Sequence, residues 1–297
     1  MLRLRDIRRR FDRAAAGFDD VDFVHAVTRN GLLSRLEPVQ VKPRNVLDLG
    51  SATGATGREL RKRFGRAHVV SLDLSHAMLA QARRRKRRFS KASYVQADAH
   101  RLPFADASFE LVVANQLLPW VADAESLFAE VARILVEGGV FAFATLGPDS
   151  FREIRAAWAQ AYVGGPSGPN SVAAEAAPTG GHVHPFPDMH NIGDALVRAG
   201  LRDPVLDVDY LAVTYGDAGK LFDDLTAAGA RNALAGRRRT LTGKRRFAAM
   251  RQALCSGERL RLDLELVYGH CWGSGPRGDA SEFRIDANNI ARRRRGG

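Results

Sequence analysis

A turn of small residues in the first half of the chain is the feature best suited to binding chemistry. The apolar run 45–49 leads into Gly50-Ser51-Ala52-Thr53-Gly54. Without bulky side chains, such a turn lets backbone N–H groups and the N-terminus of the next helix approach a ligand closely. Strands followed by small residues occur in many α/β proteins, so the turn alone only suggests a nucleotide site.

Carboxylates follow two later apolar runs. Asp73 ends one of them, twenty-five residues after Asp48, and Asp98 with Ala99 follows a shorter one. A carboxylate at the end of the second strand can accept hydrogen bonds from both ribose hydroxyls, and one after the third can accept from an adenine amino group. Each carboxylate alone is equally consistent with a helix cap or a surface charge. Their order nevertheless predicts a nucleoside site along one sheet edge.

Strand and helix patterns alternate from about residue 45 to residue 146. Apolar, β-branched runs indicate buried parallel strands, and stretches of helical period separate them. The alternation predicts an α/β, doubly wound, mostly parallel sheet with helices on both faces. Segments 201–215 and 262–268 alternate apolar and polar residues and are expected to form an antiparallel C-terminal edge. The predicted strands are 45–49, 68–73, 111–114 and 140–145, and the predicted helices are 56–64, 77–88 and 124–136.

The rest of the chain is expected to surround this sheet. Residues 1–44 look mostly helical and are predicted to form a cap, with the main domain at 45–272. Residues 164–181 are rich in Gly, Pro, Ser and Ala, which predicts a flexible lid insertion at about 160–190. From residue 273 a disordered basic tail is expected.

Composition narrows the function classes. The 297 residues are 45% hydrophobic, without the apolar run of roughly 18 to 20 residues that a membrane span needs, and the N-terminus is charged, so a cytoplasmic protein is expected. Cys255 and Cys271 are too few for a disulfide framework. His182, His184 and His190 cluster without a matching cysteine or carboxylate pair. No metal site is predicted, and the first two histidines are candidate substrate-facing lid residues.

Basic residues occur in runs within a net charge of +12, which favours an acidic partner. The runs at 83–88 and 292–295 are typical of a solvated helix face or a disordered end. Arg237-Arg238-Arg239 and Lys244-Arg245-Arg246 are candidates for steering an acidic protein.

The spaced motifs together resemble the class I S-adenosylmethionine-dependent methyltransferases, which have a Rossmann-like fold. They are Asp48-x-Gly-x-x-Thr-Gly54, Leu72-Asp73-Leu-Ser-x-x-Met78-Leu-x-x-Ala82, Asp98-Ala-x-x-Leu-Pro-Phe104-x-Asp-x-Ser-Phe109-Glu-Leu-Val112 and Leu135-x-x-Gly-Gly139. The resemblance implies S-adenosyl-L-methionine as cofactor, with Asn115 and Gln116 near the transferable methyl group. The cofactor contacts that it implies are Asp48, Gly50, Ser51, Gly54, Asp73, Leu74, Met78, Asp98, Ala99 and Asn115.

The turn departs from this family at Ala52, where glycine is usual. A Cβ there narrows the methionine end of the site, and a positive φ would add strain of roughly 1 kcal/mol. Weaker cofactor binding is therefore expected if the backbone requires that φ, and no effect if the backbone is ordinary.

Motifs on both sides of this core resemble the malonyl-acyl-carrier-protein O-methyltransferases of biotin synthesis. They include Phe11-Asp12-Arg13-Ala14-Ala15, Phe18-Asp19, Asn115-Gln116-Leu-Leu-Pro-Trp120, His184-Pro-Phe186 and Val267-Tyr-Gly-His270-x-Trp272, and the resemblance covers most of residues 10–272. It implies methylation of the free carboxyl of a malonyl group on an acidic acyl-carrier protein. It also implies that Phe18 closes over the cofactor, although Phe18, Trp120 and Trp158 are equally compatible with an ordinary core.

Methyl transfer to a carboxylate needs no catalytic base, because the acceptor is already ionised and orientation supplies the rate. This agrees with the absence of a catalytic dyad in the sequence. Two alternatives stay open. One is a complex I assembly factor-like protein, an arginine hydroxylase or a non-catalytic protein on the same fold. The other is a nucleic-acid methyltransferase, which is disfavoured because no nucleic-acid module is appended. The sequence leaves the oligomeric state open.

Overall fold

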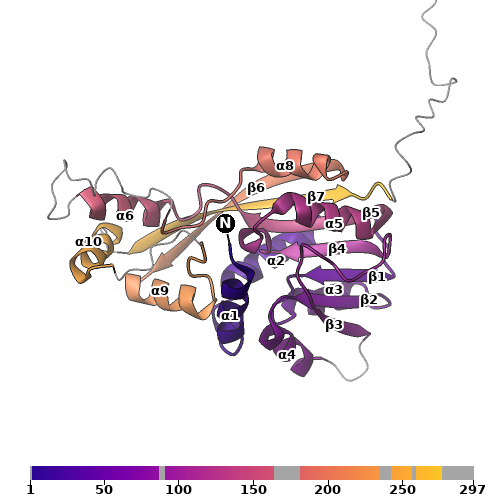
Figure 1. Cartoon of the computed structure of the whole chain (residues 1–297), viewed down its shortest axis with the longest axis horizontal. Coiled ribbons are helices and arrows are strands. Elements are labelled where there is room, and N and C mark those ends of the chain that lie inside the picture. Colours follow the sequence, from indigo (N-terminus) through magenta and orange to yellow (C-terminus); the bar gives the residue numbers. More distant parts are fainter. Residues whose placement is uncertain (1, 87–90, 164–180, 235–241, 256–258, 276–297) are drawn as a thin grey trace, which may run out of the picture.

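A seven-stranded mixed sheet organises the part of the chain that the computed structural model describes, residues 2–86, 91–163, 181–234, 242–255 and 259–275 (Figure 1). The strand order is β3-β2-β1-β4-β5-β7-β6. Pairing from β3 through β5 is parallel, whereas β7 is antiparallel to both β5 and β6. The strands are β1 Asn45–Leu49, β2 His68–Asp73, β3 Ala92–Gln96, β4 Phe109–Asn115, β5 Leu135–Leu146, β6 Arg202–Tyr215 and β7 Leu260–Trp272. The predicted α/β sheet with an antiparallel C-terminal edge is confirmed.

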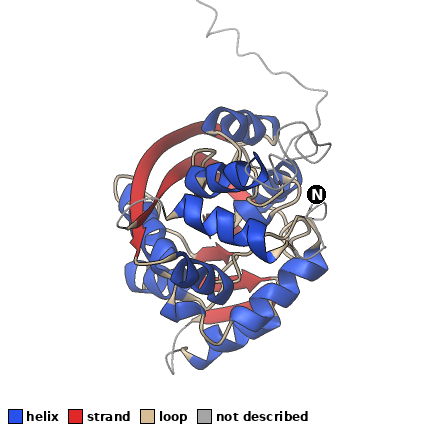
Figure 2. Ribbon diagram, turned by 90° about the vertical axis from the view of Figure 1, so that its left-hand side faces the viewer, coloured by secondary structure: helices blue, strands red, loops and turns tan. Residues whose placement is uncertain are grey.

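Helices pack on both faces of this sheet, whose strands are twisted (Figure 2). Several begin where a side chain accepts backbone N–H groups of the first turn: Ser75, Asp123, Asp188 and Asp217. The longer helices are α1 Leu4–Ala14, α2 Phe23–Arg35, α3 Ala55–Arg63, α4 His76–Arg84, α5 Ala124–Ile134, α6 Arg152–Val163, α8 Met189–Arg198, α9 Ala218–Ala227 and α10 Lys244–Leu254. Short 3-10 turns are η1 Phe18–Asp20 and η2 Leu118–Trp120.

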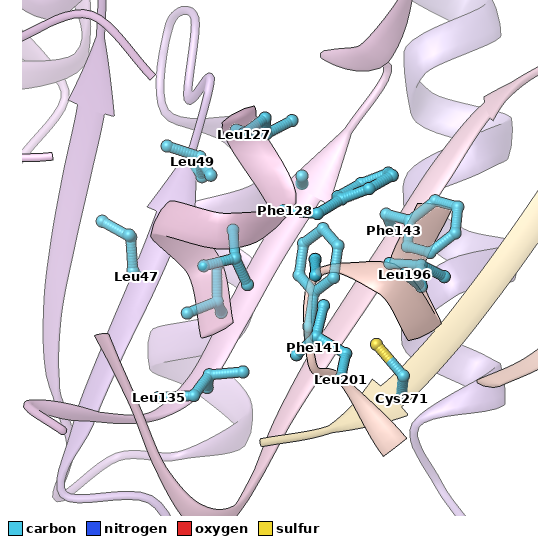
Figure 3. Close-up of a cluster of buried hydrophobic side chains, with 14 of the residues drawn as sticks. Leu47, Leu49, Leu127, Phe128, Leu135, Phe141, Phe143, Leu196, Leu201 and Cys271 are labelled. Atoms are coloured by element: carbon cyan, nitrogen blue, oxygen red, sulfur yellow. The ribbon is translucent and has the colours of Figure 1, made fainter. Parts of the chain in front are cut away.

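The core has a layer on each side of the sheet. In one layer Phe128 of α5 packs with Phe141 and Phe143 of β5, beside Leu196 of α8 (Figure 3). On the other face, buried residues of α2 and α3 such as Leu32 and Leu60 cover the same strands. Because β1 is covered on both faces, its apolar residues are fully buried, and a continuous hydrophobic run is the pattern expected of such a strand.

Strands β6 and β7 run past the rest of the sheet, and α6, α9 and α10 gather around their overhanging end (Figure 1). A separate apolar cluster holds this region together. It joins Trp158 of α6, Leu221 of α9, Met250 of α10 and Leu262 of β7. The overhang therefore builds a second structural unit beside the parallel strands.

Several element boundaries differ from the sequence prediction, and two of them have a clear structural reason. The helix predicted at 124–136 ends at Ile134, because Leu135 already has extended backbone and starts β5. Strand β7 spans Leu260–Trp272, longer than the predicted 262–268, since it pairs along its length with both β5 and β6. The predicted lid at 164–181 lies almost entirely outside the described residues, as do Arg237, Arg238, Arg239 and the tail from residue 276.

The described ranges contain no candidate for a membrane span or for a metal site. Among these residues, no helix combines the length and the apolar character that crossing a membrane requires. In the same ranges, no three His, Cys, Asp or Glu side chains are grouped so that they could hold a metal ion.

Candidate active site

A cavity lies at the carboxyl ends of the parallel strands, against α1 and α2. The turns after β1, β2, β3 and β4 each contribute to its lining. The structure thus brings together most of the residues that the sequence singled out: Phe18, Gly50, Ser51, Asp73, Leu74, Asp98, Ala99, Asn115, Gln116 and Trp120. Parallel strands place their carboxyl ends at one edge, so residues far apart in the chain meet there.

Asp48, Gly54 and Met78 do not line this cavity. Asp48 is 1% exposed, and its carboxylate accepts a 2.8 Å hydrogen bond from the Gly57 N–H in the first turn of α3. Gly54 precedes α3 with φ 77°, and a Cβ there would stand 2.9 Å from that of Ala82. Met78 is fully buried in a small cluster beneath η1. These three residues support the cavity from behind.

Asp73 joins two of the turns. Its two carboxylate oxygens accept 2.8 Å hydrogen bonds from the backbone N–H groups of Ala52 and Ser75. Burial raises the pKa of Asp73 to about 6. Each carboxylate oxygen can accept more than one hydrogen bond, so Asp73 still has acceptor capacity for a ligand.

The N-terminal segment is fastened over the cavity by polar contacts to three different turns. Asp12 of α1 accepts from Ser75 Oγ at 2.6 Å. Thr53 Oγ1 donates to Asp19, which also pairs with Arg85. At the end of β4, Asn115 Nδ2 donates to a main-chain carbonyl of α2 at 3.0 Å. The predicted cap therefore contacts the site directly in the structure.

The sequence reasoning missed three polar residues at the start and on the inner face of α2, and one after β3. Asp22, His25 and Arg29 recur at helical spacing and line the cavity, where Arg29 lies 3.6 Å from Asp22. This recurrence of polar residues at helical spacing was the signal in the sequence that could have identified them. Arg29 shares the lining with the first turn of α3, and a cation beside a helix N-terminus suits a carboxylate ligand. His100 also lines the cavity, and its Nδ1 lies 2.7 Å from Asp98 Oδ1.

A second cavity, of about 490 Å³, adjoins the first and extends beneath α6, α9 and α10. Most of its lining is apolar or aromatic. His184 and His182 both line it. His184 is held between two backbone groups, with its Nδ1 3.3 Å from the Pro119 carbonyl and its Nε2 accepting from Ala233 N–H at 2.9 Å. Burial lowers the pKa of His184. Because its Nε2 accepts a hydrogen bond, that nitrogen carries no proton and the ring is neutral in this arrangement.

His182 belongs to the aromatic wall of the second cavity. Its ring stacks on Trp158 at a centroid distance of 3.8 Å, and its Nε2 lies 2.9 Å from the Tyr162 hydroxyl. Across the junction with the first cavity, Trp120 contacts Phe11 edge to face at 5.0 Å. The candidate lid histidines therefore line the second cavity, and Trp120 lines both cavities.

Comparisons with known proteins agree with this geometry. The family described as "Methyltransferase domain" matches residues 47–143. A malonyl-[acyl-carrier protein] O-methyltransferase from Halorhodospira halophila (strain DSM 244 / SL1) is 39% identical, with 98% of this chain and 96% of that protein covered. The protein of the same name from Gallionella capsiferriformans (strain ES-2) is 37% identical, with 91% of each covered.

Solved structures with low sequence identity share the fold. The YcgJ protein from Bacillus subtilis matches with a TM-score of 0.58 at 14% identity, covering 83% of this chain and 99% of that one. A Haemonchus contortus phosphoethanolamine N-methyltransferase 2, solved with phosphomonomethylethanolamine and S-adenosylhomocysteine, matches with a TM-score of 0.56 at 16% identity. The match covers 92% of this chain and 60% of the Haemonchus one.

Proposed function

The chain belongs to the malonyl-[acyl-carrier protein] O-methyltransferase family of S-adenosylmethionine-dependent methyltransferases, and we propose that it methylates the free carboxyl group of a malonyl thioester on an acyl-carrier protein. The observation that carries this proposal is the second cavity, which is large, mostly apolar and adjoins the first, with which it shares lining residues. Such a space suits an acyl chain on a flexible arm better than a nucleic-acid base. The product would enter biotin synthesis, in the cytoplasm.

The first cavity fits S-adenosyl-L-methionine. Ser51 Oγ and Asn115 Oδ1 are buried there without a hydrogen-bond partner, which is the state expected of groups that await a ligand. In this proposal Asp73 binds the ribose hydroxyls, Arg29 the methionine carboxylate, and Asp98 with Ala99 the adenine edge. When bound, the cofactor supplies an electrophilic methyl group on its sulfonium sulfur.

The protein's own residues position and desolvate the acceptor. Phe11 and Trp120 form an apolar wall between the two cavities, and the fastened N-terminal segment covers the cofactor side. A carboxylate that loses water there is a stronger nucleophile, and a fixed approach supplies much of the rate. No proton has to move, so the reaction requires no base.

The strain expected at Ala52 is present, because its φ is 44°. Ala52→Gly should raise the free energy of unfolding by about 0.5 to 1 kcal/mol, since glycine adopts this backbone without a Cβ penalty. It should also tighten S-adenosylmethionine binding, because Ala52 lines the cavity. Denaturant titration and calorimetry measure the two effects. Ala107→Gly is the matched control, with φ 49° outside both cavities, and should gain stability only. A destabilised Ala52→Gly protein would contradict the strain argument.

Helix α10 provides a basic rim for an acidic carrier. Lys244 and Arg245 in its first turn are exposed, and Phe247, one turn on, lines the second cavity. Arg246 lies over the Tyr162 ring at 4.8 Å. Charges at the edge of a binding site mainly accelerate association and are screened by salt.

Reversing both exposed charges, Lys244→Glu with Arg245→Glu, should raise KM for the malonyl carrier several-fold, and added salt should reduce the difference from wild type. Turnover of a small malonyl thioester without carrier should stay unchanged. The matched control is Arg83→Glu with Arg84→Glu at the end of α4, which lines neither cavity. Steady-state kinetics at several salt concentrations make the comparison. Equal loss with both substrates would show that α10 is only structural.

Incubation with labelled S-adenosylmethionine and a purified malonyl carrier tests the function itself. We expect the carrier to gain the mass of one methyl group, and an acetyl carrier and nucleic acid to gain none. If the cofactor binds but no malonyl group is methylated, the assembly factor-like alternative, an arginine hydroxylase or a non-catalytic protein, becomes the better explanation.

A further inference from the structure

The junction of the two cavities has an unusual composition. Among the described residues, four line both cavities: Phe11, His25, Gln116 and Trp120. The aromatic rings of Phe11 and Trp120 pack against each other edge to face, so this pair offers an apolar surface. The polar groups at the junction are therefore the side chains of His25 and Gln116. An acceptor oxygen that reaches the methyl group from the second cavity must pass them.

Gln116 is held at this point at a cost in free energy. Its φ is 59°, in the left-handed region that non-glycine residues avoid, and its N–H is fixed to the Ala144 carbonyl at 2.7 Å. The residue is 5% exposed, and its side-chain Nε2 has no hydrogen-bond partner. Strained backbone and an unpartnered buried donor together are typical of a residue kept for a ligand.

His25 faces the same junction from α2. Its ring meets Phe18 edge to face at 5.0 Å, and its carbonyl is anchored by Asn115. Burial, and to a smaller extent Arg29 one turn later, lowers the pKa of His25 to about 4. The imidazole is therefore neutral near pH 7 and offers one N–H donor.

We propose that Gln116 and His25 form the binding site for the acceptor's carboxylate, so that they select a carboxyl-bearing thioester and aim its oxygen at the methyl group. This inference rests on the proposed function. In the transfer, a carboxylate oxygen forms a bond to the methyl carbon while the carbon–sulfur bond breaks and leaves its electron pair on sulfur. Neutral donors suit this step, because a direct ion pair with lysine or arginine would hold the nucleophile's charge more tightly.

Calorimetry on protein saturated with S-adenosylhomocysteine tests the site without turnover. The probes are malonyl-pantetheine and acetyl-pantetheine, which differ in the carboxylate. Wild-type protein should prefer the malonyl probe by at least about tenfold. Gln116→Leu and His25→Leu should each weaken malonyl binding by about tenfold to a hundredfold, the range for losing one hydrogen bond to a charged group. Acetyl binding should change less than twofold, and S-adenosylmethionine affinity should fall much less than malonyl affinity.

Two further variants separate a binding role from a folding role. Gln116→Gly removes the backbone strain, so it should raise the free energy of unfolding and still lose the malonyl preference. His25→Gln keeps an N–H donor and should retain most of that preference. Equal weakening of both probes, or a wild-type protein that binds them equally, would overturn the carboxylate site. A retained preference with no methyl transfer to any malonyl thioester would instead count against the proposed function.

Discussion

Asp73→Asn is expected to weaken S-adenosylmethionine binding by at least about a hundredfold. The wild-type carboxylate can accept two hydrogen bonds from the ribose, each worth roughly 1.5 to 3 kcal/mol as a charge-assisted contact. The amide also turns an NH₂ group toward one of the two backbone N–H groups, at Ala52 or Ser75, that the carboxylate now holds. Calorimetry measures the affinity, and circular dichroism with thermal melting shows whether the fold is kept.

A ligand pair distinguishes direct ribose contact from loss of turn geometry. Wild-type protein should bind adenosine more tightly than 2′,3′-dideoxyadenosine, and Asp73→Asn should abolish this discrimination. Asp106→Asn is the matched control, because that exposed carboxylate pairs with Arg133 and lines neither cavity. If Asp73→Asn still distinguishes the two nucleosides, Asp73 does not contact the ribose.

The sequence predicted the parallel half of the sheet because its signals are local. Continuous apolar runs such as 45–49 and 68–73 mark strands buried on both faces, and the turn residues that follow them mark the ligand edge. Asp73 and Asn115 could be placed for that reason. A residue at the end of a strand reaches a known edge of the sheet. Its place can therefore be predicted without knowing the rest of the fold.

Residues outside those strand ends could not be placed in the same way. His25 and Arg29 face the site only because α2 packs with one particular side toward β4, and that rotation is set by tertiary contacts such as the one from Asn115. The second cavity depends on α6, α9 and α10 meeting around the overhang of β6 and β7, which no local pattern encodes. Asp48 differs from Asp73, because it belongs to the motif, yet its carboxylate accepts a hydrogen bond from the Gly57 N–H and does not line the cavity.

Burial at that position gives Asp48 a marked effect on the pH dependence of stability. Burial is the main cause that raises the pKa of Asp48 to about 7, against about 3.9 in an unfolded chain. Between these values the folded state holds a proton that the unfolded state has lost, so the contribution of Asp48 to stability falls as pH rises from about 4 to about 7. His25 acts in the opposite sense over nearly the same window. Its lowered pKa makes its contribution present above about 6.5 and lost as pH falls toward 4.

Asp73, whose pKa burial raises to about 6, acts in the same direction as Asp48, and His25 opposes both. The wild-type profile alone therefore does not reveal the contribution of Asp48, and single variants have to be compared with it. Asp48→Asn cannot ionise, and its free energy of unfolding relative to wild type should rise by several kcal/mol, at most about 4, between pH 4 and pH 7. His25→Gln, which lacks the opposing contribution, should show a steeper decline in stability toward neutral pH than wild type. Guanidinium titrations at pH 4.5, 6 and 7.5, followed by tryptophan fluorescence, provide the comparison. If the Asp48→Asn and wild-type curves stay parallel across these pH values, Asp48 ionises normally in the folded protein and its burial does not control its protonation.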